Sequence, residues 1–72
     1  MKLTPNQTEW IMQKTKAWLD KYMEMVPLTD EQWQECADEM KRLSKSARED
    51  LLMRKMLIAG YEYLEEVSKE EK

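Results

Sequence analysis

Side chains that could carry acid–base chemistry occur in this sequence mainly as pairs of carboxylates. Glu35 and Glu39 lie four residues apart, as do Glu62 and Glu66, and this spacing puts both members of a pair on one face of a helix. General acid–base catalysis most often uses histidine, and the chain has none. Such pairs are typical of a solvated helix face, so we expect neither a catalytic site nor enzymatic activity.

Cys36 is the only cysteine, which excludes a disulfide within the chain. One thiol without any histidine is too small a ligand set for a structural zinc site. The residue falls next to Ala37 and Met40 on an apolar stripe, where a cysteine behaves as a small hydrophobic side chain. We therefore expect no metal and no cofactor.

A basic segment separates two acidic ones. Residues 1–40 carry a net charge of −4, residues 41–55 one of +4 and residues 56–72 one of −3. Four basic side chains could contact an anion or nucleic acid at a turn between helices: Lys41, Arg42, Lys45 and Arg48. Nucleic-acid binding needs a broad basic footprint, and the overall charge of −3 argues against it. Three acidic side chains could face a basic groove on a partner protein: Glu62, Glu65 and Glu66.

The composition is that of a helical protein, because good helix formers dominate and the chain has one glycine and two prolines. Thr4, Pro5 and Gln7 predict the start of a first helix, as the N-cap, the proline of the first turn and the capping-box residue. This helix should run from about residue 5 to residue 25, because Pro27 disfavours its continuation. Its apolar arc of about 160°, which we expect to be buried, contains Ile11, Met12, Thr15, Trp18, Leu19, Tyr22, Met23, Met25 and Val26.

A second helix is predicted from about residue 30 to residue 44. Thr29 and Gln32 form another capping box, and acidic residues in the first turn complement the helix dipole. The buried stripe of this helix should consist of Trp33, Cys36, Ala37, Met40 and Leu43.

A third helix is predicted from about residue 47 to residue 68, after a turn at residues 44–46. Ser46 and Glu49 have the spacing of a third capping box. The fold expected for this single domain is a small all-α, three-helix up-down-up bundle. If the turn at 44–46 is absent, the alternative is a helical hairpin with one long arm, which would have to dimerise to bury its apolar faces.

The third predicted helix has more apolar surface than one face can hold. Its expected core arc contains Leu52, Met53, Met56, Leu57, Ala59, Gly60, Tyr63, Leu64 and Val67. Leu51, Ile58 and Tyr61 fall outside this arc on adjacent turns and form a seam with Ala47. Trp10 similarly falls outside the arc of the first helix. We interpret these five residues as a protein interface.

These features predict a small, non-enzymatic protein–protein interaction module of the inhibitor or adaptor type. A chain of 72 residues is marginally stable alone, so we expect a homodimer through the third helix. By size and charge alone it could be a phage or mobile-element protein that blocks a host enzyme or defence complex. A lone thiol, with neither a signal peptide nor a membrane span, predicts a cytoplasmic location.

Two other classes of function remain open. In one, an oligomer holds a small anionic ligand between its subunits, bound by the basic turn at residues 41–48. In the other, the protein is a DNA-binding regulator that uses the same turn.

Overall fold

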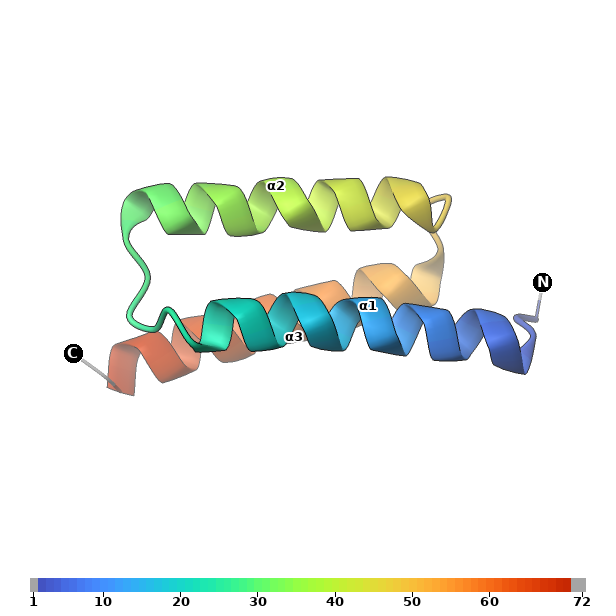
Figure 1. Cartoon of the computed structure of the whole chain (residues 1–72), viewed down its shortest axis with the longest axis horizontal. Coiled ribbons are helices and arrows are strands. Elements are labelled where there is room, and N and C mark those ends of the chain that lie inside the picture. The colour runs from blue at the N-terminus through green and yellow to red at the C-terminus, as the bar shows by residue number, and fades with distance from the viewer. Residues whose placement is uncertain (1, 71–72) are drawn as a thin grey trace.

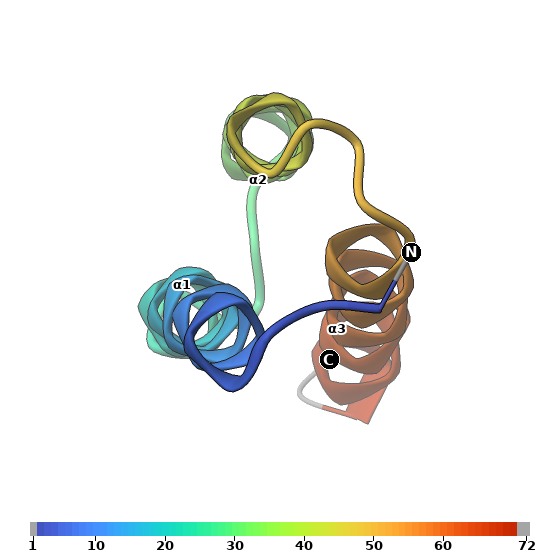
Figure 2. The same ribbon diagram turned by 90° about the vertical axis from the view of Figure 1, so that its right-hand side faces the viewer.

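The computed structural model describes residues 2–70, which form a small three-helix bundle, as the sequence predicts. Helix α1 spans Pro5–Met23, α2 spans Asp30–Ser46 and α3 spans Leu51–Glu70. α1 and α3 run in the same direction and α2 runs back, so the topology is up-down-up (Figure 1). Seen from one end, the three helices stand at the corners of a triangle (Figure 2). Within the described range, no helix combines the length and the apolar character that crossing a membrane requires.

Both predicted capping boxes at the starts of α1 and α2 are present. The Thr4 side chain accepts a hydrogen bond from the Gln7 backbone N–H at 3.3 Å, and the Gln7 side chain accepts one from the Thr4 N–H at 2.8 Å. Thr29 and Gln32 repeat this exchange at 3.2 and 2.9 Å. Each box satisfies two backbone donors that the first turn of a helix leaves free. α1 ends at Met23, two residues earlier than predicted.

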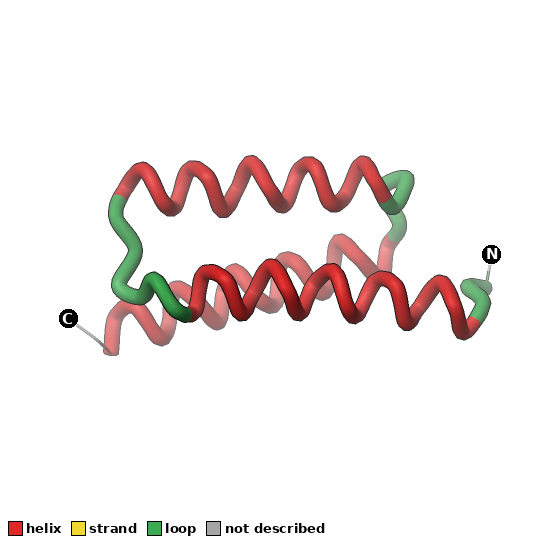
Figure 3. Tube along the Cα trace, in the orientation of Figure 1, coloured by secondary structure: helices red, strands yellow, loops and turns green. Residues whose placement is uncertain are grey.

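The predicted turn at residues 44–46 is wrong, and so is the long-armed hairpin. α2 continues through Ser46, and the chain turns at residues 47–50, in the loop between α2 and α3 (Figure 3). Arg48 and Glu49 both have positive φ angles, of 55° and 57°. The Glu49 N–H donates to the Ser44 carbonyl at 2.6 Å and the Arg48 N–H to the Lys45 carbonyl at 3.0 Å. These two bonds form a Schellman motif, which closes the last turn of α2.

Asp50, rather than Ser46, caps the start of α3. Its carboxylate accepts a hydrogen bond from the Leu52 N–H at 2.9 Å, and its carbonyl accepts one from the Arg54 N–H at 3.1 Å. This is the geometry of an N-cap residue. The predicted capping box of Ser46 and Glu49 therefore does not form, because both residues belong to the end of α2 and its closing turn.

The core lies mainly between α1 and α3, which make the most extensive contact of any helix pair. Its fully or almost fully buried apolar side chains are Ile11, Trp18 and Tyr22 from α1, Cys36 from α2, and Met53, Leu57 and Leu64 from α3. α2 thus contributes one such side chain and covers one side of the α1–α3 pair.

Gly60 allows α1 to approach α3 closely. A Cβ atom at this position would lie 2.7 Å from Cζ3 of Trp18 and 3.6 Å from Cδ1 of Leu19. Trp18 is 3% exposed, and its indole N–H points to the Cys36 carbonyl at 3.4 Å. The single glycine of the chain is therefore the contact point at which the Trp18 ring packs on α3.

Candidate interaction surfaces

The carboxylate of Glu39 joins α1 to α2. It accepts a hydrogen bond from the Tyr22 hydroxyl at 2.9 Å and forms an ion pair with Lys21. Burial alone would raise the pKa of Glu39, but the hydrogen bonds from Lys21 and Tyr22, with the charges of Lys21 and Arg42, lower it overall. Burial and the bond to Glu39 raise the pKa of Tyr22 well above its ordinary value. Glu39 is therefore an ionised, structural member of the Glu35/Glu39 pair.

Cys36 has the environment of an inert buried thiol, as predicted. Its side chain is fully buried. Burial first, and the nearby charge of Glu39 second, raise the pKa of this thiol to about 11. Because the thiolate is the nucleophilic form, Cys36 is unreactive near neutral pH in the folded protein. Among the described residues, no three or more potential ligands come together in a way that could hold a metal ion.

Leu51 and Ile58 lie exposed on the outer face of α3. Leu51 is 62% exposed and Ile58 is 50% exposed, and their seven-residue spacing puts them on one stripe. Tyr61 does not share this stripe. It is half-buried on the side of α3 that faces α2, where its ring meets Trp33 edge-on with centroids 5.2 Å apart. The seam predicted from the sequence is thus reduced to an outer ridge of Leu51 and Ile58.

Trp10 and Ala47 lie together at another place. Trp10 is partly exposed on α1, and Ala47 packs against the core at the end of α2. Both line a cavity of about 660 Å³ with Lys2 and Arg48. This cavity lies at the end of the bundle that faces the viewer in Figure 2, where the N-terminal segment crosses toward α3. The five predicted interface residues therefore do not form one continuous patch.

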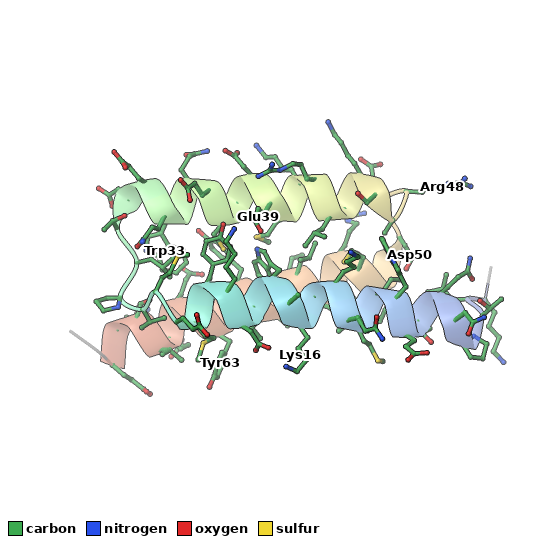
Figure 4. All side chains as sticks on the ribbon, in the orientation of Figure 1. Lys16, Trp33, Glu39, Arg48, Asp50 and Tyr63 are labelled. Carbon is green, nitrogen blue, oxygen red and sulfur yellow. The ribbon has the colours of Figure 1, made fainter. Side chains whose placement is uncertain are left out.

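Three exposed residues, Met12, Ala59 and Tyr63, were expected in the core, and that prediction was wrong. Met12 and Tyr63 are each 53% exposed. In Figure 4, Tyr63 points away from α2, as does Lys16, which lies one helical turn after Met12 on α1. Ala59, one turn before Tyr63, is also exposed, and Leu52 and Met56 are half-buried. We call Met12, Leu52, Met56, Ala59 and Tyr63 the open face of the α1–α3 pair.

The width of the apolar arcs is the sequence signal for this open face. A helix that packs on one core usually needs an apolar stripe little wider than about 100°. The arc of the first helix spans about 160°, and the third helix has apolar side chains on nearly every side. Without the position of α2, the sequence could not show which part of each arc stays uncovered.

The fold collects charges of opposite sign at its two ends. The end of α1, the start of α2 and the end of α3 meet at one end (Figure 1), where the acidic residues are Asp20, Glu24, Asp30, Glu31, Glu35, Glu62, Glu65, Glu66 and Glu70. At the opposite end, the basic residues are Lys2, Lys41, Arg42, Lys45, Arg48, Arg54 and Lys55. The three predicted partner-facing glutamates, Glu62, Glu65 and Glu66, are all exposed at the acidic end.

Comparisons of the chain with protein-family models, with curated proteins and with solved structures find no match. The surfaces described above are therefore the basis for assigning a function.

Proposed function

We propose that this protein is a non-enzymatic protein–protein interaction module of the inhibitor or adaptor type, which acts by occupying a surface on a larger protein. The observation that carries this proposal is the exposure of large apolar side chains on both α1 and α3. Trp10, Met12, Leu51, Ile58 and Tyr63 are between 38% and 62% exposed. These residues lie at separate places, and Met12 and Tyr63 are grouped with the half-buried Leu52 and Met56 on the open face. Grouped exposed apolar side chains mark interaction sites in small proteins, and methionine and aromatic residues are enriched at interfaces.

The outer ridge of Leu51 and Ile58 is the self-association surface in this proposal. Two copies packed through α3 would remove both side chains from water, which stabilises the assembly by about 25 cal/mol for each Å² of apolar surface buried. Oligomerisation is also the usual way in which a chain this short gains stability without a disulfide or a metal.

A double variant tests the homodimer. We expect the wild type to be dimeric at high micromolar concentration by light scattering, and Leu51→Glu with Ile58→Glu to be monomeric with an unchanged helical circular dichroism spectrum. Lys41→Glu is the matched control, since Lys41 is exposed on α2, away from the ridge, and the variant makes the same change of two charge units. A monomeric wild type at that concentration would refute self-association.

Capture from a lysate tests the partner. We expect the wild type to retain a protein in stoichiometric amount, and Tyr63→Lys on the open face to lose it while keeping the fold. Retention only on a nucleotide or DNA matrix, with release by salt, would replace the proposal.

A small anionic ligand is the second candidate function. The observation that favours it is the cavity of about 660 Å³ at the basic end, where Lys2 and Arg48 belong to the lining together with Trp10 and one acidic residue, Asp50. Of the four basic residues predicted to contact an anion, Arg48 is the one that lines this cavity.

A further inference from the structure

A second cavity lies at the acidic end, between the start of α2 and the last turns of α3. Its volume is about 350 Å³. Trp33 and Asp30 of α2 and Tyr61, Glu65 and Ser68 of α3 belong to its lining. From the sequence, Trp33 was predicted in the buried stripe of the second helix and Glu65 among three glutamates that face a basic groove on a partner protein.

The lining combines groups that suit a positively charged ligand. Trp33 and Tyr61 pack edge-to-face and are half-buried, so part of each side chain stays accessible at the cavity. The face of an aromatic ring attracts cations. Asp30 and Glu65 supply carboxylates. Ser68 is 6% exposed, and its buried hydroxyl oxygen has no hydrogen-bond partner among the described residues.

Glu65 lies close to the aromatic pair in electrostatic terms. Burial, and then the charge of Glu65, raise the pKa of Tyr61 above its ordinary value. A carboxylate that disfavours a negative charge on the ring oxygen must favour a positive charge placed nearby.

We propose that this cavity receives an arginine side chain of a partner protein. A planar guanidinium can stack on an aromatic ring and bind a carboxylate through two N–H groups at the same time, whereas a lysine ammonium is a compact point charge. The acidic surface extends far beyond the cavity, over the ends of all three helices, which indicates a basic protein surface around the arginine rather than a free small cation. The inference rests on the proposed partner-binding function.

Lys69 also lines the cavity and is the nearest competing positive charge. Its removal should therefore strengthen the binding of an external guanidinium. Stronger binding after removal of Lys69 would show that the guanidinium binds inside the cavity, next to this residue.

Nuclear magnetic resonance with N-acetyl-arginine amide as the probe tests the inference. The three indole N–H signals report on three separate places, because Trp33 lies at this cavity, Trp10 at the basic end and Trp18 in the core. We expect the Trp33 signal to shift and saturate at millimolar probe while the other two stay in place. N-acetyl-citrulline amide has the same shape without the charge and should leave all three unchanged.

Matched variants distinguish binding in this cavity from a general electrostatic attraction to the acidic end of the protein. Glu65→Gln should weaken probe binding about threefold to fivefold, and Lys69→Ala should strengthen it. Glu62→Gln removes the same charge from an exposed position that does not line the cavity, and it should leave the affinity nearly unchanged.

Three results would overturn the arginine site: equal shifts with the citrulline probe, a shift of Trp10 instead of Trp33, or equal weakening by Glu62→Gln and Glu65→Gln. None of these three results affects the lysate capture by the open face. If a partner protein is retained but the arginine probe does not shift the Trp33 signal, the arginine site is refuted and the proposed function stands. A failed capture with a saturable Trp33 shift would remove the proposed function and leave a cation site.

Discussion

At the scale of single residues, Gly60 determines how closely the two main helices pack. Glycine inside a helix normally lowers stability by about 1 kcal/mol relative to alanine. Here, however, the missing side chain makes room for the Trp18 ring, which would lie 2.7 Å from an added Cβ. Trp18 is buried and held at both ends of its ring system, so it cannot move away at little cost.

Gly60→Ala should therefore destabilise the protein, although helix propensity predicts the opposite sign. Overpacking a core typically costs 1–3 kcal/mol, which exceeds the propensity gain, so we expect a net loss of about 1 kcal/mol in a urea titration. Ala59→Gly at the exposed neighbouring position measures the propensity effect alone. A Gly60→Ala variant stabilised by the amount that Ala59→Gly destabilises would contradict the packing argument.

Glu39 is the second residue with a specific consequence, which concerns acid stability. Its pKa is lower in the folded protein than the ordinary value of 4.5. The ionised carboxylate thus stabilises the fold above about pH 4.5, and this contribution disappears as the pH falls through the lower folded-state pKa. The stabilisation at neutral pH should be about 1 kcal/mol, as for a hydrogen bond to a partly exposed charged group.

We expect Glu39→Gln to be less stable than the wild type at pH 7, and the difference to shrink as the pH is lowered below 4.5, in thermal unfolding followed by circular dichroism. Glu35→Gln, one turn earlier on the exposed face, should change stability by less than about 0.5 kcal/mol over the same pH range. A constant difference between the wild type and Glu39→Gln over this range would show that packing, not charge, is what the substitution removes.

At the scale of helices, the sequence predicted the starts of α1 and α2 better than the turn between α2 and α3, since α3 begins at Leu51 and not near residue 47. The boxes of Thr4 with Gln7 and Thr29 with Gln32 are hydrogen-bonded pairs within four residues, so they can be recognised locally. The end of α2 was missed because its Schellman motif has Arg48 where glycine is the usual residue. Without that glycine, the serines at positions 44 and 46 were the strongest turn signal in the region.

Arg48→Gly should stabilise the protein. A left-handed conformation costs a non-glycine residue roughly 1–2 kcal/mol. Glycine avoids this strain in the folded protein, but its greater conformational freedom in the unfolded chain offsets part of the gain. We expect a net gain of about 0.5–1 kcal/mol in a urea titration. Arg48→Ala keeps the strain but removes the guanidinium, so it should show no gain. Equal effects of the two substitutions would mean that the side chain, not the φ angle, matters.

At the scale of the whole molecule, the three-helix fold followed from periodicity and caps, but the surface did not. The stripe containing Cys36 on α2 was predicted correctly, because a narrow stripe has only one possible orientation. The wide arcs of α1 and α3 allow several orientations, and Met12 and Tyr63 were therefore assigned to the core although they are exposed. Which part of a wide arc is covered depends on the place of a third helix, and that is information from tertiary structure.

The clusters of charge also belong to the whole molecule. Along the sequence, the basic segment simply lies between two acidic ones. The up-down-up topology brings the acidic residues between positions 20 and 35 and those between 62 and 70 to the same end, and it places the cavity of Trp33 and Tyr61 there. The long axis of the protein measures 42 Å, several times the distance of about 8 Å over which physiological salt screens a charge. The two ends therefore act on their surroundings independently.

Opposite charges held at the two tips of a rod make it turn in the field of another molecule before the two touch. Near a positively charged protein, the electrostatic torque would point the tip with Glu65 forward and the tip with Arg48 backward. An encounter that begins with this alignment leaves mainly rotation about the long axis to be searched, so association speeds up at low ionic strength.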